Sequence, residues 1–189
     1  MDKELAGELA RTALELLSEP VTERLPFDSG RPIRRIASLA NALHCSPQRL
    51  DFVSERANEL YHLAKEIEKV DGTVRRTYDA RKPLKDIHRL IKTAILDRVE
   101  FPSYLTGSLK GQDYKTNAAI HVGAAILITE DIESFFPSTT DERVFDVWRN
   151  FFRFSVEVAK CLTNLTTRNN QLPQGRDLIA VRERLINRF

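Results

Sequence analysis

Apolar residues recur every three or four positions in the first third of the chain, which is the spacing of an amphipathic helix. The pattern over 3–18 ends at Pro20, and a proline-containing loop separates it from a second helix predicted over 32–43. A serine followed by a proline at 46–47 is typical of a helix start and predicts a third helix that continues to about Lys69. The sequence therefore opens with a largely helical region.

A turn signal interrupts the helical spacing in the middle of the chain. Asp71-Gly72 lies between two short runs and predicts a β-hairpin. Helical spacing returns over 84–99, in a segment after Thr140, and from Val156 to about Arg168. The chain is thus expected to mix helices with a small amount of sheet, which is an α+β fold.

A continuous apolar run over 125–129 ends abruptly in acidic residues. Such a run predicts a buried strand with Asp131 at its carboxyl end, where α/β sheets place their ligands. A carboxylate with one open side can hold a Mg²⁺ ion that also touches substrate phosphates. The alternative is an aspartate that caps a helix or closes a turn, and this stretch alone leaves both interpretations open.

Composition sets limits on the class of protein. The 189 residues are 42% apolar and carry a net charge of +2, which favours one globular domain without a global field for nucleic acid. No apolar run is long enough to cross a bilayer, and the first residues lack a signal-peptide pattern, so a cytoplasmic protein is expected. Cys45 and Cys161 lie far apart without metal-ligand spacing and are expected to be free thiols.

Positive charge is concentrated locally instead. Between Arg75 and Lys92 the chain has seven lysines or arginines against two acids, Asp79 and Asp86. Such a surplus suits the phosphates of a nucleic acid. A solvated helix face with no partner explains the same pattern, and the charge run alone does not separate the two interpretations.

Several motifs resemble those of one enzyme family. Asp131-Ile-Glu-Ser-Phe-Phe136 resembles the first palm motif of reverse transcriptases, and Leu172-Pro-Gln-Gly175 resembles the start of their second motif. Gly107-Ser-Leu-Lys-Gly111, Asn117-Ala-Ala-Ile-His121 and the basic hairpin precede them in the order typical of bacterial retron-type enzymes. An ordered set of motifs is more specific than any single member. The resemblance runs from about residue 65 to residue 175 and implies RNA-directed DNA synthesis.

The resemblance also implies a domain organisation. It predicts part of a right-hand polymerase with an α+β fold. Residues 1–66 would form a helical N-terminal extension, 67–124 a fingers region and 125–175 the start of the palm. Residues 176–189 would be an aberrant C-terminal tail.

Site residues follow from the same resemblance. Asp131 would be catalytic and would bind Mg²⁺ together with the backbone carbonyl of Ile132. Phe136 would abut the sugar of the incoming nucleotide and reject a 2′-hydroxyl, while Lys69 and Arg75 would approach its phosphates from the hairpin. The implied nucleotide-binding residues are Lys69, Arg75, Ile132, Phe136, Gln174 and Gly175. The basic stretch adds Arg76, Lys85, Arg89 and Lys92 as predicted nucleic-acid-binding residues, and the resemblance adds Lys110. The implied partners are an RNA template, a DNA primer and deoxynucleotides.

The sequence departs from the family after Gly175. The expected Thr-Ser segment, the strand with paired aspartates and the thumb have no counterpart in 176–189. One Asp cannot hold two divalent cations against water, so the chain alone is expected to be inactive. A frameshifted remnant and a split gene whose second chain completes the palm both explain this departure.

A different interpretation begins from residues 36–50. This segment resembles a helix-turn-helix, the motif that DNA readers place in the major groove. It would make the protein a non-catalytic nucleic-acid-binding or regulatory module. A groove reader needs basic side chains at the start of its second helix, where only Arg49 qualifies.

Overall fold

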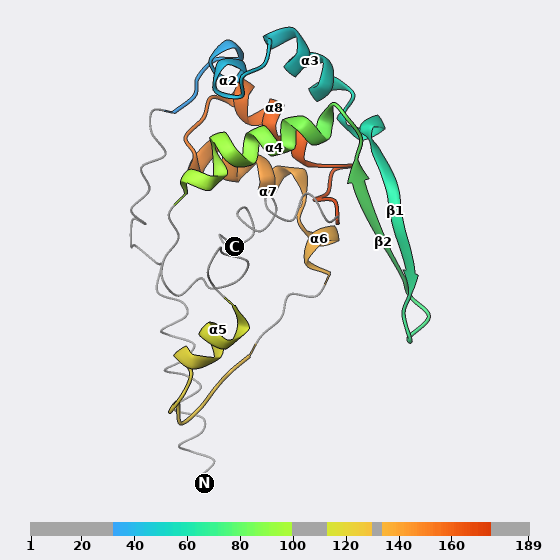
Figure 1. Cartoon of the computed structure of the whole chain (residues 1–189), viewed down its shortest axis with the longest axis vertical. Helices are drawn as coiled ribbons and strands as arrows, with labels where there is room; N and C mark the ends of the chain where they lie inside the picture. The colour runs from blue at the N-terminus through green and yellow to red at the C-terminus, as the bar shows by residue number, and fades with distance from the viewer. Residues whose placement is uncertain (1–31, 100–112, 130–133, 175–189) are drawn as a thin grey trace.

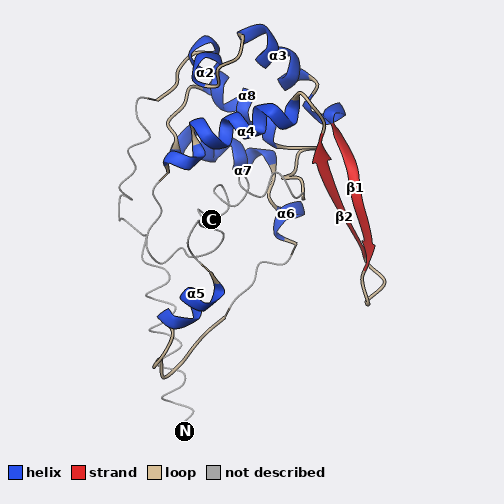
Figure 2. Cartoon of the chain, viewed as in Figure 1, coloured by secondary structure: helices blue, strands red, loops and turns tan. Residues whose placement is uncertain are grey.

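The computed structural model describes residues 32–99, 113–129 and 134–174 (Figure 1). These residues form short helices and a two-stranded antiparallel sheet (Figure 2). The helical elements are α2 (Ile36–Ala42), α3 (Pro47–Glu55), η1 (Ala57–Leu60), α4 (Leu84–Ala94), η2 (Leu96–Arg98), α5 (Tyr114–Ile120), α6 (Phe135–Ser138), α7 (Asp141–Asp146), η3 (Val147–Phe151) and α8 (Val156–Thr166). The strands are β1 (Tyr61–Glu68) and β2 (Val74–Ala80). The mixed content confirms an α+β composition.

Helix α8 lies at the centre of the hydrophobic core. It packs against α2, α3, α4 and α7 and buries Val158, Leu162 and Leu165 on its apolar face. Its first turn is capped by Ser155, whose hydroxyl accepts a hydrogen bond from the Val158 amide at 3.3 Å. Each fully buried leucine contributes about 1.5 to 3 kcal/mol relative to an exposed one. The buried apolar face of α8 therefore stabilises the packing of the helices around it.

The predicted helix start at 46–47 is confirmed. The Ser46 hydroxyl accepts from the Arg49 amide at 3.2 Å, and Pro47 occupies the first turn of α3. His44, at a φ of 51°, lies in the left-handed region that lets the chain turn sharply between α2 and α3. The two helices are joined by a tight turn, as the resemblance of residues 36–50 to a helix-turn-helix implied.

The predicted extent of that third helix is wrong. It ends at Glu55, and after the single turn of η1 the chain becomes strand β1. Pairing with β2 explains the difference, because β1 gains cross-strand partners that an isolated helix would not provide. Tyr61, at the start of β1, is buried in the core, whereas the rest of the strand is increasingly exposed.

The predicted hairpin is confirmed. The Lys69 amide donates to the Thr73 carbonyl at 2.8 Å, and the Gly72 amide donates to the Lys69 carbonyl at 2.9 Å. Gly72 has a φ of +78°, which glycine adopts without a steric penalty. Asp71 accepts bonds from the hydroxyl and amide of Thr73, and these bonds lower the pKa of its carboxyl. This hairpin extends away from the helical core (Figure 1).

The strand predicted over 125–129 is not formed. These residues have no regular secondary structure, and Ile126, Leu127 and Ile128 are 60%, 58% and 65% exposed. A strand needs a neighbour to pair its backbone groups, and the sheet in the described part of the chain consists of β1 and β2 only. The expectation of a buried palm strand here is therefore wrong for this structure.

Two other predicted segments, the helix over 3–18 and the tail over 176–189, lie outside the described residues. Across the described ranges, no helix combines the length and hydropathy that spanning a bilayer would require.

Candidate functional site

Residues 168–174, here called the connecting segment, follow α8 and join it to two other parts of the molecule. A tight turn opens the segment, in which the Arg168 amide donates to the Gln171 carbonyl at 2.8 Å. The two asparagines of this turn have φ values of 49° and 60°, a conformation that asparagine tolerates better than most residues. The Leu172 amide then donates to the Thr139 carbonyl at 2.9 Å, which attaches the segment to the end of α6.

The end of the connecting segment lies against strand β2. The Tyr78 amide donates to the Gln174 carbonyl at 2.6 Å, so the main chain of Gln174 occupies part of the open edge of the hairpin. The Arg75 guanidinium faces the side-chain amide of Gln174. With the amide oxygen oriented toward it, Arg75 donates from Nη2 at 2.6 Å and from Nε at 3.0 Å. Arg75 of the hairpin and Gln174 of the connecting segment, both predicted to bind the nucleotide, are therefore brought together.

Lys69 lies on the same hairpin, close to the turn. Arg75 pairs with Ile67 across the strands, so these two side chains share a face, and alternation places Lys69 on that face as well. The Lys69 and Arg75 side chains are both exposed. The hairpin thus offers an ammonium and a guanidinium on one accessible face.

Phe136 lies on α6, close to Thr139. Its ring meets the ring of Phe135 edge to face, with centroids 5.4 Å apart, and both rings are half-buried against the core. Ser134, at a φ of 50°, begins this helix in the left-handed region. Since Thr139 is bonded to Leu172, the connecting segment links Phe136 to the same structural unit as Gln174.

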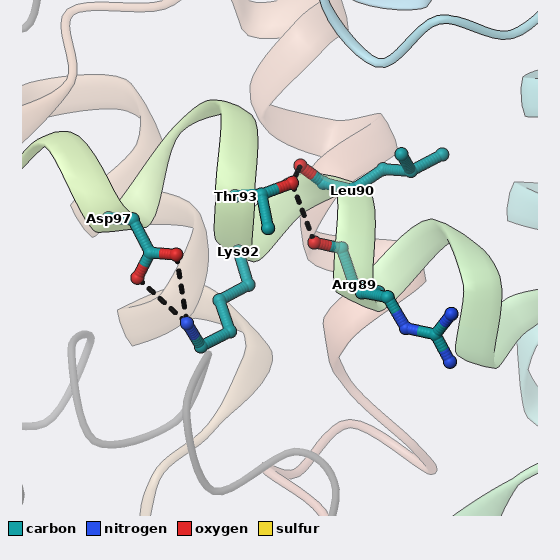
Figure 3. A network of polar contacts seen from close by, with 5 residues as sticks. All are labelled: Arg89, Leu90, Lys92, Thr93 and Asp97. Carbon is teal, nitrogen blue, oxygen red and sulfur yellow. Dashed lines mark hydrogen bonds and ion pairs between the residues drawn. The ribbon is translucent and has the colours of Figure 1, made fainter.

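Most of the predicted nucleic-acid-binding side chains that the structure describes already face acids. Arg76 donates to Glu66 at 2.6 Å, Lys85 to Asp79 at 3.1 Å, and Lys92 to both oxygens of Asp97 at 2.8 and 2.9 Å. In Figure 3 the Lys92 and Asp97 side chains meet, whereas the Arg89 guanidinium points away from that pair. The Arg76–Glu66 pair is exposed, and an exposed pair contributes little, about 0 to 1 kcal/mol, so phosphates would displace that acid at small cost. The Lys85 and Lys92 side chains are half-buried.

Four predicted site residues lie outside the described residues: Lys110, Asp131, Ile132 and Gly175. Within the described ranges, His, Cys, Asp and Glu side chains form no group of three or more that could hold a metal ion. The expectation of a Mg²⁺ site therefore depends on Asp131 and Ile132.

Two further contacts near the hairpin have no signal in the sequence. The Arg168 guanidinium lies 3.9 Å from the centroid of the Tyr78 ring, a cation–π geometry. Deeper in the core, the Tyr61 hydroxyl and the His88 Nε2 atom both approach the Leu165 carbonyl, at 3.4 and 2.6 Å. Burial raises the pKa of Tyr61, and the positive charge of Arg168 partly opposes this shift. Arg168 marked only the end of a helix in the sequence, and neither Tyr61 nor His88 belonged to a recognised motif.

Comparison with known proteins assigns relatives to the chain. No family model matches it. Retron Se72 reverse transcriptase of Salmonella heidelberg (strain 579083-10) is 34% identical over 150 residues, which are 79% of this chain and 40% of that protein. Retron Ec48 reverse transcriptase of Escherichia coli is 27% identical over 158 residues, covering 78% of this chain and 39% of that protein. Retron Ec86 reverse transcriptase, also of Escherichia coli, is 31% identical over 102 residues, or 54% and 32% of the two chains.

The chain thus spans about 40% or less of the length of these relatives. All three are retron reverse transcriptases, and the first two alignments each cover more than three quarters of this chain. The resemblance seen in the motifs is therefore confirmed. The chain is a homologue of the retron reverse transcriptases and aligns with part of their length.

Proposed function

We propose that this chain carries the nucleotide-facing fingers of an RNA-directed DNA polymerase of retron type. The contact between Arg75 and Gln174 carries the proposal, because it joins the hairpin to the Pro-Gln pair of the connecting segment. Arginine's planar fork can bind a phosphate through two parallel hydrogen bonds. With its Nε and Nη2 atoms held by the Gln174 oxygen, the guanidinium would stay in place and keep its Nη1 donors for the triphosphate.

The partners in this proposal are an RNA template, a DNA primer and a deoxynucleotide. Lys69 adds a second positive charge on the hairpin face, and Phe136 supplies an apolar ring for the sugar. Arg76, Lys85, Arg89, Lys92 and Lys110 would contact nucleic-acid phosphates, and Gly175 would lie beside the nascent base pair.

Mg²⁺ would be held by the Asp131 carboxylate and the Ile132 carbonyl, since both are the oxygen ligands that this ion prefers. When bound, it would supply charge neutralisation for the triphosphate. Full polymerase activity is proposed for a protein of the relatives' length, or for an assembly in which a second chain supplies the remaining palm.

A nucleotide-dependent binding assay tests this function. The chain is titrated into a labelled DNA primer on an RNA template, with Mg²⁺ and either the deoxynucleotide complementary to the next template base or a mismatched one. We expect the complementary deoxynucleotide to lower the dissociation constant for the duplex by about tenfold, which corresponds to about 1.4 kcal/mol. Duplex binding that ignores the nucleotide would contradict the proposal.

Duplex binding that does not respond to the nucleotide would favour a non-catalytic nucleic-acid-binding module. The unit formed by α2 and α3 is the candidate for such a module, since the predicted turn and helix cap are both present. Its one basic side chain at the expected place, Arg49, lies 3.8 Å from Asp86 of α4. This engagement makes the helix-turn-helix interpretation the weaker of the two.

A further inference from the structure

We propose that Arg168 is a positioning residue that holds strand β2 so that Arg75 meets Gln174. Arg168 does this by packing its guanidinium on the Tyr78 ring, 3.9 Å from the centroid. The inference rests on the proposed function, because it concerns the same nucleotide-facing pair. Arg168 would not touch the nucleotide, and it lies outside both the hairpin and the Leu172-Pro-Gln-Gly175 motif.

The connecting segment, residues 168–174, contacts β2 on both faces and at its edge, an arrangement here called the clamp. Side chains alternate along a strand, so Tyr78 and Arg75, three positions apart, project from opposite faces. Arg168 covers the Tyr78 face, the Gln174 side chain meets Arg75 on the other face, and the Tyr78 amide donates to the Gln174 carbonyl at the edge. The connecting segment therefore wraps around the edge of the strand.

The position of Arg168 explains why the ring is its favourable contact. Its side chain is partly buried, and Nε is a buried atom without a hydrogen-bond partner in the described part of the chain. A partly desolvated guanidinium gains more from contact with an aromatic face than a fully exposed guanidinium does. Lysine lacks the planar group that stacks on a ring, so it would replace this contact only in part.

The clamp is also anchored to the core. The Asn169 amide donates to the Asn58 side-chain oxygen at 2.9 Å, which connects the turn to η1 beside the hairpin. The Leu172 amide donates to the Thr139 carbonyl, and Leu172 itself is buried. Since the segment is fixed at both of these points, the orientation of Arg168 determines where β2 lies relative to Gln174.

Amide hydrogen exchange of the whole chain, without nucleotide, tests the positioning role. Arg168→Met should speed exchange of the Tyr78 amide by about fivefold to twentyfold, because without the cation–π contact the edge of β2 opens more often. Arg56→Met is the matched control, since the Arg56 guanidinium lies 4.2 Å from the Phe52 ring on the exposed side of α3. The control should leave exchange at Tyr78 unchanged.

Conservative variants separate positioning from a general loss of fold. Tyr78→Phe keeps the ring and should retain wild-type exchange, whereas Tyr78→Leu should behave like Arg168→Met. Arg168→Lys should give an intermediate rate, and it keeps the proposal testable if Arg168→Met fails to fold. Unchanged exchange at position 78 in folded Arg168→Lys and Tyr78→Leu would overturn the proposal.

The nucleotide response of these variants tests the link to function. We expect the gain in duplex affinity from the complementary deoxynucleotide to shrink in Arg168→Met and Tyr78→Leu, and to persist in Tyr78→Phe. If the Tyr78 amide exchanges faster but the complementary deoxynucleotide still raises duplex affinity as much as in the wild-type chain, the positioning role is overturned. If the wild-type chain shows no nucleotide response, the proposed function fails, and the exchange rates alone decide whether Arg168 holds β2.

Discussion

Arg75 and Gln174 show how far single residues could be assigned from the sequence. Each was implicated by a motif, one beside the hairpin turn and the other in Leu172-Pro-Gln-Gly175. Their mutual contact was not predicted, because it depends on how the connecting segment returns to β2. Arg168 was missed for the same reason, since a cation–π contact between distant residues leaves no spacing in the sequence.

Phe136 provides a residue-scale prediction about sugar selection. Phe136→Ala should narrow the difference between the dissociation constants of the complementary deoxynucleotide and ribonucleotide complexes, because a smaller side chain no longer excludes a 2′-hydroxyl. Phe135→Ala is the matched control, since the two rings are in contact and are both half-buried. It should lower stability and leave the ratio of the two constants unchanged. If Phe136→Ala and Phe135→Ala give the same ratio of the two dissociation constants, Phe136 is a core residue and does not select the sugar.

The two cysteines are expected to differ in reactivity. Burial raises the pKa of Cys161 to about 11, and burial also raises the pKa of the half-buried Cys45, with Arg49 opposing the shift. Because the thiolate is the reactive form, alkylation at about pH 8 should modify Cys45 first and Cys161 only after unfolding. Peptide mass spectrometry after timed alkylation measures both rates. Faster modification of Cys161 than of Cys45 in the folded chain would contradict this.

The same shift has a consequence for stability at high pH. Below the usual pKa of 9.0, the Cys161 thiol is protonated in both the folded and the unfolded state, so it adds no pH dependence. Between this value and about 11 the unfolded thiol loses its proton first, so the free energy of unfolding falls as the pH rises. Denaturant unfolding across this pH range measures the decline, and Cys161→Ala should reduce it.

Secondary-structure elements were predictable where local signals decide them. Ser46-Pro47, Asp71-Gly72 and the apolar spacing of α4 and α8 each correspond to an observed element. The third helix was predicted too long because residues 61–68 become a strand through pairing with β2. Such pairing depends on the tertiary fold, and its energy overrides weak helix propensity.

The cap of α3 can be tested by removing one hydroxyl. Ser46→Ala should lower the free energy of unfolding by about 1 kcal/mol, because the Arg49 amide loses its acceptor. Ser38→Ala, at an exposed position inside α2, is the matched control and should change stability by less than about 0.5 kcal/mol. Denaturant unfolding followed by circular dichroism measures both variants. Equal effects would show that the Ser46 hydroxyl does not cap the helix.

The basic hairpin and α4 lead to a prediction about salt. If Arg75 and Lys85 contact phosphates, the double variant Arg75→Glu/Lys85→Glu should weaken binding of an RNA–DNA duplex. It should also flatten the plot of log affinity against log salt by about 1 for each phosphate that the protein no longer neutralises. The measurement is a duplex titration at several salt concentrations. Lys160→Glu, on an exposed position of α8, is the control and should leave the slope unchanged. An unchanged slope in the double variant would identify the basic stretch as a solvated surface.

At the scale of the whole molecule, one helical core supports the candidate site. Helix α8 is central to that core, and the connecting segment extends from its end to both α6 and β2. The α+β class followed from the mixture of helical spacing and a turn signal. Motif order predicted the resemblance to retron reverse transcriptases, and the identity with these relatives confirms it. The palm strand predicted over 125–129 is wrong, because an apolar run becomes a strand only when a neighbouring strand pairs with it. Residues 126–128 are instead exposed.

The central claim is that Arg75 and Gln174 act together on the incoming nucleotide. A double-mutant cycle measures this coupling directly, using the gain in duplex affinity that the complementary deoxynucleotide causes. Arg75→Gln and Gln174→Leu should each reduce the tenfold gain to about threefold, a loss of about 0.7 kcal/mol, and the double variant should lose little more than either single variant. Arg56→Gln should leave the gain unchanged. Single losses that simply add, or a gain unaffected by either substitution, would contradict the account.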